Sequence, residues 1–289
     1  MGTHDVAQRI GRAVSYLEAI FLGVLQGLTE FLPISSSAHL AIFPQLFGFD
    51  DPGASFTAVT QIGTEIAVLL FFWRDIVRII KAWAISLVRK DQRGDLDARM
   101  GWYIIVGTLP IAVMGFLFQD TIKTTFRSLW LIAIMLIVFG LILGVADRIN
   151  VGEKLEGDLT LKDSLLYGLG QMLALIPGVS RSGATISVGL FRGYRRDVAT
   201  RYAFLLAIPA VLASGLFQLN DVSLAASPGL PKTLVATLVA FVVGYVTIGW
   251  LLKYLRTGSY LPFVVYRVAL GSIVLILLAT GVLDSAVST

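Results

Sequence analysis

The stretch that decides the fold spans residues 26–39 and reads Gln26-Gly-Leu-Thr-Glu30-Phe-Leu-Pro33-Ile-Ser35-Ser36-Ser37-Ala-His39. It places a carboxylate, three serines and a histidine between two apolar segments, 17–25 and 40–47. Each segment is shorter than the ~20 residues that cross a bilayer as a helix. This pattern predicts a re-entrant helical hairpin whose tip, residues 33–36, lines a cavity, because irregular backbone at membrane depth is tolerated where protein or water covers it.

The composition of the whole chain predicts a polytopic membrane protein of the all-α class. Of 289 residues, 56% are hydrophobic and 15% are charged, and the mean hydropathy is +0.80, which excludes an ordinary soluble domain. A transmembrane barrel is set aside because residues 131–145 are apolar on every face. The absence of cysteine excludes disulfides, thiolate catalysis and cysteine-ligated metals.

Charge and apolar length set the expected topology. Outside the first hairpin we expect membrane spans at residues 56–73, 102–118, 129–145, 202–219, 233–255 and 262–283. The densest basic cluster, residues 74–99, is expected to be a cytoplasmic loop, which places both termini outside. The net charge of +4 indicates orientation signals and lipid-headgroup contact, so we expect no nucleic-acid partner.

A second hairpin pattern follows the polar segment in the middle of the chain. Residues 164–176 and 180–190 flank a break at Pro177-Gly178. Each half then has one hairpin and three spans, and the odd number of spans predicts an inverted-topology repeat that brings the two tips together near the midplane. We expect one membrane domain, 1–289, with repeat one at 16–147, a linker at 148–163 and repeat two at 164–289. The alignment of the halves matches Gln26, Pro33 and Ser36 with Gln171, Pro177 and Ser180.

Both predicted tips are serine-rich helix starts that suit a phosphate ligand. The unpaired N–H groups and the dipole of a helix N-terminus bind anions, so two such ends facing one another suit a diphosphate. Arg181 adds a permanent charge with forked geometry, and Gly178 permits close backbone approach. The predicted substrate-binding residues are Ser35, Ser37, Gly178, Ser180, Ser182 and Thr185.

The first stretch also predicts a cation site and a nucleophile. Gln26 and Glu30 share a helix face, and a carboxylate at mid-bilayer costs ~2.5–3.5 kcal/mol, so it needs a proton or a cation. Oxygen ligands favour Mg²⁺ or Ca²⁺ over zinc. His39 lies one turn after Ser36 on the same face, which predicts a nucleophile paired with its base.

Other polar residues keep more than one interpretation. The serines of 35–37 are equally typical of a packing seam between membrane helices. Gln61 and Glu65 line the same cavity or bond between helices. Arg267 is expected to extend from the inner end of the last span to the headgroups, and the arginines of 192–201 to serve as orientation signals.

At these motifs the chain resembles the bacterial undecaprenyl-diphosphate phosphatase family associated with bacitracin resistance. The family's first motif, Glu or Gln and then Glu ahead of Pro-x-Ser-Ser-x-x-His, matches residues 26–39, and its second, Pro-Gly-x-Ser-Arg-Ser-x-x-Thr, matches residues 177–185. The resemblance implies hydrolysis of undecaprenyl diphosphate to the monophosphate, which recycles the lipid carrier for cell-wall synthesis. It also implies a multi-pass protein of the bacterial cell membrane.

The resemblance assigns roles by position. Glu30 with Gln26 would bind the divalent cation, and Ser36 and His39 would perform the phosphoryl chemistry. Ser180, Arg181, Ser182 and Thr185 would hold the diphosphate, which makes Glu30, Ser36, His39 and Arg181 the predicted catalytic residues. Many family members carry Glu where this chain has Gln26, which removes one negative charge and implies a weaker or differently tuned metal dependence.

The expected mechanism places the prenyl tail between helices while the diphosphate enters the cavity from the external side. Ser36 attacks with His39 as base, or His39 attacks directly; we favour Ser36. The alternative function is a polyprenyl-phosphate flippase or an anion transporter, because inverted repeats with broken helices are typical of alternating access. Membrane lipids are expected partners, and a homodimer is compatible with the sequence but not required by it.

Overall fold

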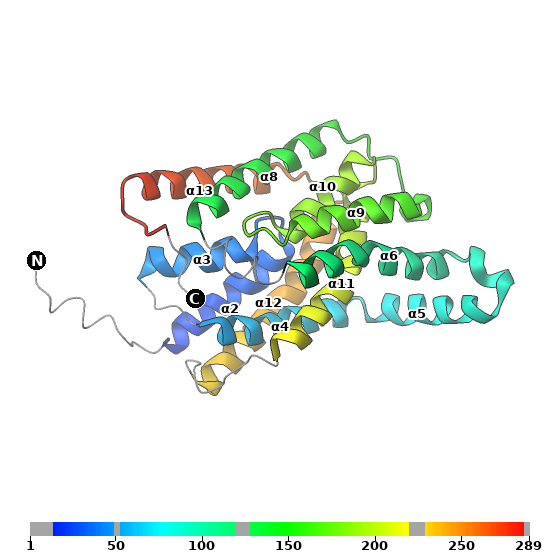
Figure 1. Ribbon diagram of the computed structural model, residues 1–289, viewed down its shortest axis with the longest axis horizontal. Helices are drawn as coiled ribbons and strands as arrows, with labels where there is room; N and C mark the ends of the chain where they lie inside the picture. Colours follow the sequence, from blue (N-terminus) through cyan, green and yellow to red (C-terminus); the bar gives the residue numbers. More distant parts are fainter. Residues whose placement is uncertain (1–13, 49–52, 119–127, 220–228, 286–289) are drawn as a thin grey trace, which may run out of the picture.

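The computed structural model describes residues 14–48, 53–118, 128–219 and 229–285. Within these ranges the regular elements are helices, and one isolated bridge pairs Lys154 with Tyr194. The first hairpin comprises α2 (Tyr16–Phe31) and α3 (Ser36–Phe47), and the second comprises α9 (Leu161–Leu173) and α10 (Arg181–Phe191). The other elements are α4 (Gly53–Phe71), α5 (Trp73–Val88), α6 (Leu96–Leu117), α8 (Leu129–Ile149), α11 (Arg196–Leu219), α12 (Leu230–Tyr254) and α13 (Leu261–Ala279), with 3-10 turns at Lys90–Gly94 and Glu156–Asp158 (Figure 1).

Five of the described helices, α6, α8, α11, α12 and α13, are long and apolar enough to cross a membrane. The consecutive helices α4 and α5 bend by 67° at Phe72 and count as a sixth span if taken together. Leu141, Leu238 and Ile276 are more than half exposed on the outer faces of such helices, where lipid would cover them. The chain is therefore an all-helical, multi-pass membrane protein, as its composition predicts.

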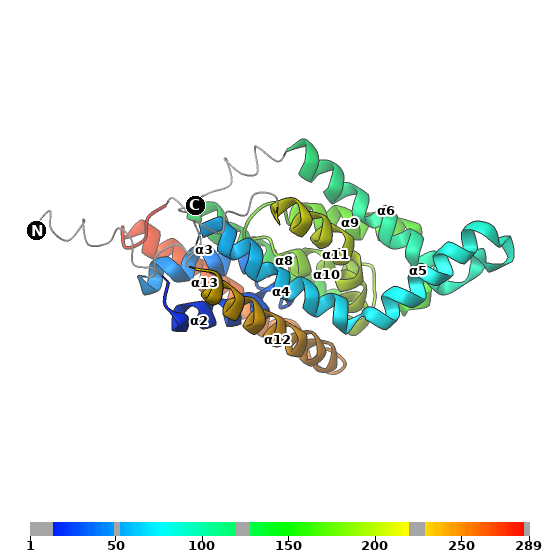
Figure 2. The same cartoon turned by 90° about the horizontal axis from the view of Figure 1, so that it is seen from below.

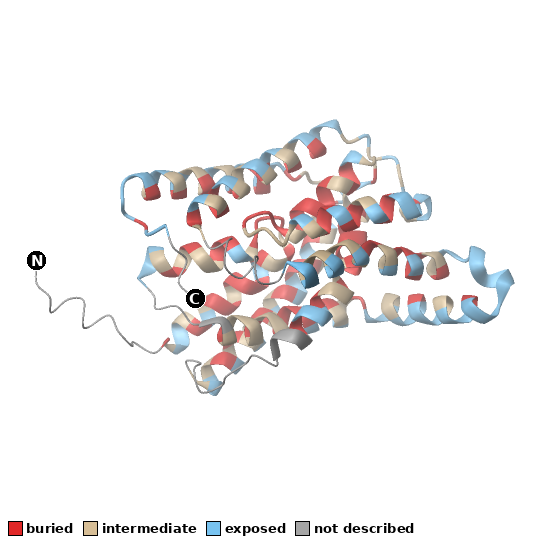
Figure 3. Ribbon diagram, in the orientation of Figure 1, coloured by how far each residue is buried: buried red, intermediate tan, exposed pale blue. Residues whose placement is uncertain are grey.

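The basic segment 74–99 is not the loop that the sequence predicts. Most of it is the helix α5, which lies beside α6 and is largely exposed (Figures 2 and 3). Ile79 is buried on the inner face of α5, and Trp83 packs against Gly101 of α6. The loop prediction is wrong because Arg74, Arg78 and Lys81 share one face of an amphipathic helix that is otherwise mostly apolar.

The two hairpins are built alike. Both α2 and α9 begin with a capping box, headed by Ser15 and Thr160 respectively. Both α3 and α10 begin after a serine with positive φ, Ser35 at 75° and Ser180 at 72°, and no other non-glycine residue in the described ranges has positive φ. These pairs share one constant sequence offset, which matches Ser35 to Ser180. The alignments of Pro33 with Pro177 and of Ser36 with Ser180 are therefore each off by one residue, whereas that of Gln26 with Gln171 agrees.

Each hairpin packs on a long helix from the other half of the chain. The helix α2 lies along α12, α9 lies along α6, and α8 pairs with α13 (Figures 1 and 2). A Cβ atom on Gly23 would collide with the carbonyl oxygen of Ala236, and one on Gly168 with that of Gly107. Glycine at these crossings permits close backbone contact. The long helices therefore hold the hairpins in place so that their tips meet.

Asp163, at the start of α9, fastens the second hairpin to the helix ends around it. Its buried carboxylate accepts hydrogen bonds from Nε of Arg192 at 2.5 Å and from the hydroxyl of Tyr194 at 2.8 Å. Burial raises the pKa of this carboxyl, but hydrogen bonds from Thr160, Arg192 and Tyr194 outweigh that effect and hold the pKa below its usual value. Arg192 therefore ties helix ends together, in addition to any effect on orientation.

Candidate active site

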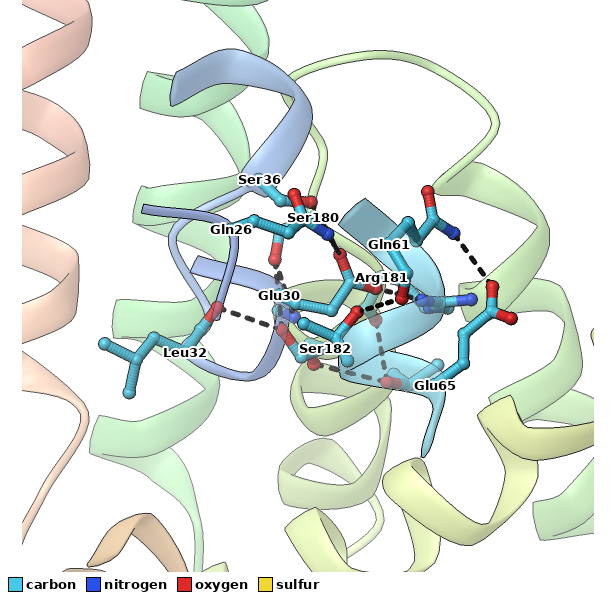
Figure 4. A network of polar contacts seen from close by, with 12 residues as sticks. Gln26, Glu30, Leu32, Ser36, Gln61, Glu65, Ser180, Arg181 and Ser182 are labelled. Atoms are coloured by element: carbon cyan, nitrogen blue, oxygen red, sulfur yellow. Dashed lines mark hydrogen bonds and ion pairs between the residues drawn. The ribbon is translucent and has the colours of Figure 1, made fainter. Parts of the chain in front are cut away.

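Glu30 and Arg181 join the two hairpin tips. Glu30 lies in the last turn of α2, Arg181 opens α10, and Nη2 of Arg181 forms an ion pair with Oε1 of Glu30. The other carboxylate oxygen, Oε2, accepts hydrogen bonds from the hydroxyl of Ser36 at 2.9 Å and from Nε2 of Gln26 at 3.2 Å (Figure 4). The Glu30 side chain is 11% exposed. The structure thus brings three predicted site residues onto the largely buried carboxylate of a fourth, Glu30.

Two further contacts cross between the tips. The hydroxyl of Ser182 donates to the carbonyl oxygen of Leu32 at 3.2 Å, and the amide of Gly178 donates to Oγ of Ser37 at 3.4 Å. Gly178 has a φ of +91°, and a Cβ atom there would lie 2.5 Å from the carbonyl oxygen of Ile132 in α8. This position therefore requires glycine. The close approach predicted at Gly178 is made by the protein's own backbone.

The serines at the two helix starts form matching pairs of hydroxyl groups. Oγ of Ser35 lies 3.1 Å from Oγ of Ser37, and Oγ of Ser180 lies 3.2 Å from Oγ of Ser182. Ser180 caps its helix by accepting the amide of Gly183 at 3.2 Å, whereas Ser35 makes no side-chain cap. The second tip is therefore a capped helix start, and the first presents its hydroxyls without a cap.

A cavity of about 590 Å³ opens beside the tips. Its polar wall consists of Thr29, Glu30, Ser35, Ser36, Ser37, Gln61, Ser180 and Arg181, and Thr108 and Ser214 add hydroxyl groups from α6 and α11. Its apolar wall comes mainly from α6 and α11 and includes Ile111, Ala112, Phe116, Leu175, Pro209, Ala210 and Ala213. This size is in the range of small-molecule sites. The cavity is amphipathic, because the polar tips face the apolar surfaces of two long helices.

A second acidic side chain, Glu65, belongs to the same region. With Glu30 and Arg181 it lines a smaller cavity of about 20 Å³, and Nε2 of Gln61 donates to Oε1 of Glu65 at 3.4 Å (Figure 4). A Cβ atom on Gly215 would collide with the Glu65 carboxylate. Gln61 and Glu65 therefore line the cavities. The sequence signal is the Gln-x-x-Thr-Glu pattern at residues 61–65, which repeats the pattern of residues 26–30.

His39 and Thr185 are not directed into the cavity. His39 is buried, with Nδ1 2.7 Å from the carbonyl oxygen of Ser35 and Nε2 2.7 Å from the hydroxyl of Tyr266. No hydrogen bond joins Ser36 to His39 within the described chain, because Ser36 donates to Glu30 instead. The hydroxyl of Thr185 donates to the carbonyl oxygen of Arg181 at 2.8 Å, as is usual for threonine within a helix.

The oxygen atoms around Glu30 are of the chemical type that binds a hard divalent cation. Oε1 of Gln26 is buried and has no hydrogen-bond donor within the described residues. Carboxylate, amide and hydroxyl oxygens are the ligands that Mg²⁺ and Ca²⁺ prefer. No group of three His, Cys, Asp or Glu residues gathers in the described ranges. The protein therefore offers a partial ligand set, which phosphate oxygens of a substrate would have to complete.

Arg267 does not extend to the headgroups. Its side chain is fully buried between α8 and the two tips and donates to backbone carbonyl oxygens of both tips. The expectation is wrong because the pattern of α13 gives only the depth of Arg267 along the helix. Which face it occupies depends on packing against elements far away in the sequence.

The fold and the site define a class of multi-pass membrane proteins in which two helical hairpins meet at one buried, polar site. A family model described as bacitracin resistance protein BacA matches residues 19–273. The chain belongs to this family.

Individual relatives match the chain over nearly its whole length. An undecaprenyl-diphosphatase from Nocardioides sp. is 60% identical over 271 residues, which cover 93% of this chain and 99% of the relative. Undecaprenyl-diphosphatases from Pseudarthrobacter chlorophenolicus and Renibacterium salmoninarum are 57% and 54% identical over 277 and 280 residues. Those alignments cover 94% and 95% of this chain and 100% of each relative.

Proposed function

We propose that this protein hydrolyses undecaprenyl diphosphate to undecaprenyl phosphate and inorganic phosphate, and so recycles the lipid carrier for cell-wall synthesis. The names and the high identity of its relatives support this activity. The observation that carries it is the contact of Ser36 and Arg181 with Glu30 at the polar wall of an amphipathic cavity. A hydroxyl, a carboxylate and a guanidinium in contact are suited to phosphoryl transfer.

Ser36 is the proposed nucleophile. Its Oγ bonds to the terminal phosphorus, the bond from that phosphorus to the bridging oxygen breaks, and undecaprenyl phosphate leaves. Water then hydrolyses the phosphoserine to serine and inorganic phosphate. Glu30 is the group that the Ser36 hydroxyl contacts, at 2.9 Å, and it can take the proton. A role of His39 as the base requires its ring to leave Ser35 and Tyr266.

Arg181 and the serine-rich helix starts form the proposed diphosphate site. The Arg181 guanidinium would stabilise the charge on the transferred phosphoryl group, which is the main catalytic lever in such reactions. Ser35, Ser37 and Ser180 lie on the cavity wall and would contact phosphate oxygens directly. The other predicted binding residues, Gly178, Ser182 and Thr185, would act by shaping the second tip, since their contacts are with protein atoms.

We further propose Mg²⁺ or Ca²⁺ as the cofactor. When bound, such an ion supplies positive charge to the diphosphate oxygens. Oε1 of Gln26 and the Glu30 carboxylate would hold it, and Arg181 would then share the carboxylate with the ion. Gln26→Glu adds a negative charge to this ligand set and should tighten metal binding, measured as the concentration of Mg²⁺ that gives half-maximal activity.

The proposed topology is an inverted repeat in which the cavity opens to the external side. The support is that α2 packs on α12 as α9 packs on α6, while α8 and α13 pair with each other. The cysteine-free chain allows a direct test at exposed positions. Thr257→Cys should react with a membrane-impermeant maleimide from the cytoplasm and Val282→Cys from outside. Labelling of both from one side would overturn the topology.

Phosphate release by the purified protein tests the proposed activity. In detergent, with undecaprenyl diphosphate and Mg²⁺, the wild type should release inorganic phosphate, and Glu30→Gln and Arg181→Ala should not. Glu153→Gln and Arg195→Ala, which remove the same charges from exposed sites away from the cavity, should keep the wild-type rate. Absence of release, with scrambling of labelled lipid in vesicles, would instead assign the protein as a flippase.

A further inference from the structure

Arg267, in α13, is a fully buried arginine that contacts three separate segments. Nη1 donates to the carbonyl oxygen of Pro33 in the first tip at 3.1 Å. Nη2 donates to the carbonyl oxygens of Gly178 and Val179 in the second tip at 2.9 and 3.0 Å. Nε donates to the carbonyl oxygen of Leu136 in α8 at 3.1 Å. One side chain thus holds both tips against the same helix.

The surroundings of Arg267 are shaped for this side chain. No carboxylate forms an ion pair with it in the described ranges, so its charge faces backbone carbonyl groups alone. A Cβ atom on Gly183 would lie 2.7 Å from Nη1, and one on Gly140 would lie 3.1 Å from Cβ of Arg267. A buried guanidinium is costly unless its donors are satisfied. The backbone of both tips supplies that satisfaction.

The carbonyl groups that Arg267 binds stand beside the two strained serines. Val179 directly precedes Ser180, and Pro33 lies two residues before Ser35. A non-glycine residue with positive φ persists when its surroundings fix it. Arg267 fixes the peptide groups that lead into both serines, and these serines set the direction of Ser36 and Arg181.

We propose that Arg267 is a positioning residue for the reaction, an inference that rests on the proposed function. It locks the first tip to the second, so that Ser36 and Arg181 meet at Glu30. Arg267 lines neither of the two cavities that contain Glu30, so it acts through the tips rather than on substrate. The forked guanidinium is required because its donors must point to three segments at once, which the single ammonium of lysine does not do.

The first test compares Arg267→Lys with Arg196→Lys. Arg196 is the matched control, because its Nε binds Asp147 at 2.6 Å away from the tips. Both variants should unfold at lower temperature. Arg267→Lys should lower kcat about 100-fold per folded molecule, with a smaller change in KM, as expected for misplaced reacting groups. Arg196→Lys should leave kcat within about twofold. Equal kcat in the wild type and Arg267→Lys would overturn the proposal.

The second test measures the arrangement of the tips by cysteine labelling and does not depend on activity. Val179 is fully buried, so Val179→Cys should resist a small maleimide, and adding Arg267→Lys should expose it, whereas adding Arg196→Lys should not. If the cysteine at position 179 is equally protected alone, with Arg267→Lys and with Arg196→Lys, the positioning role is overturned. Equal labelling of that cysteine with either lysine variant would overturn it too.

A second variant, Gly183→Ala, places a methyl group against Nη1 of Arg267. It replaces Arg267→Lys if that variant fails to fold, and it should also lower kcat. If the wild type releases no phosphate, the proposed function fails, while the labelling still decides whether Arg267 locks the tips.

Discussion

The two hairpin tips share a backbone but differ in chemistry. Ser35 and Ser180 have nearly the same φ, and each hydroxyl lies close to that of the serine two residues later. The residue between the paired serines is Ser36 in the first tip and Arg181 in the second, and both side chains bind Glu30. One local structure therefore presents a hydroxyl from one side and a guanidinium from the other.

This difference shows how one site is divided between two similar elements. Phosphoryl transfer needs a nucleophile and a positive charge near the transferred group, and here each tip supplies one of the two. Glu30 connects the two groups. One of its carboxylate oxygens accepts a hydrogen bond from the Ser36 hydroxyl, and the other forms an ion pair with Arg181. This division predicts that the tips are not interchangeable.

The largest effect should come from exchanging the two chemistries. The double variant Ser36→Arg/Arg181→Ser keeps both residue types but moves each to the other tip, and it should lose at least about 1000-fold in kcat because the nucleophile no longer contacts Glu30. The single variant Ser36→Ala should lose as much while still binding inorganic pyrophosphate by calorimetry. Substantial recovery of activity in the exchanged protein would show that the tips are equivalent.

A smaller effect is expected when Arg181 in the second tip is replaced by lysine, which keeps the positive charge but lacks the forked guanidinium group. Arg181→Lys should lower kcat/KM about 100-fold, because an ammonium cannot make the same paired contacts with Glu30 and phosphate oxygens. Steady-state phosphate release measures this loss. The exposed pair of Arg195 and Asp197 provides the control, since Arg195→Lys should keep the wild-type value. A wild-type rate in Arg181→Lys would show that Arg181 acts through its positive charge alone and not through its forked geometry.

His39 sharpens the comparison further, since Ala184 takes its place in the second tip. His39→Ala should lower kcat about tenfold, because the ring contacts Ser35 and Tyr266 and so supports the first tip. Tyr266→Phe should have a similar or smaller effect. A general base contributes about 10²–10⁴-fold, so a loss of that size in His39→Ala, with little change in Tyr266→Phe, would assign the base to His39.

The smallest effect on activity is expected far from both tips, at Asp163. Asp163→Asn should lower the free energy of unfolding by about 1–3 kcal/mol without changing kcat, because its buried hydrogen bonds lose a charged acceptor. The native pKa of Asp163 is held low, so its contribution is complete above the unfolded pKa and is lost as pH falls through the native pKa.

Thermal unfolding of both proteins across acid pH measures the contribution of Asp163. The difference in unfolding temperature between the wild type and Asp163→Asn should become smaller as the pH is lowered. Asp197→Asn, at an exposed ion pair, should show almost no gap at any pH. A gap for Asp163→Asn that is independent of pH would contradict a charged Asp163 as its cause.

The sequence predicts the hairpins and much of the site because their signals are local. Apolar runs broken at Pro33 and at Pro177-Gly178 give the hairpins. The serines at the two helix starts and the spacing of Gln26 and Glu30 give the polar residues of the site. The helical character of α5 is obscured because basic residues recur throughout residues 74–99, although the period of the apolar residues of α5 is present.

The contacts across the tips are not local, and sequence spacing does not give them. Helical spacing alone predicts a Ser36–His39 pair, but Ser36 donates to Glu30, and His39 contacts the carbonyl oxygen of Ser35 and the hydroxyl of Tyr266 instead. Arg267 is more than two hundred residues from Pro33 in the chain, yet the two are hydrogen bonded. Such pairings depend on which helices pack together, and here each hairpin packs on the opposite half.

The most direct test locates the phosphoryl group during turnover. Purified protein is mixed with undecaprenyl diphosphate and Mg²⁺, quenched in neutral detergent where phosphoserine and phosphohistidine both survive, and analysed by peptide mass spectrometry. The division of the site predicts phosphate on Ser36 in the wild type, more of it in a variant slowed at the hydrolytic step, and none in Ser36→Ala. Phosphate on His39, or full turnover by Ser36→Ala, would contradict it.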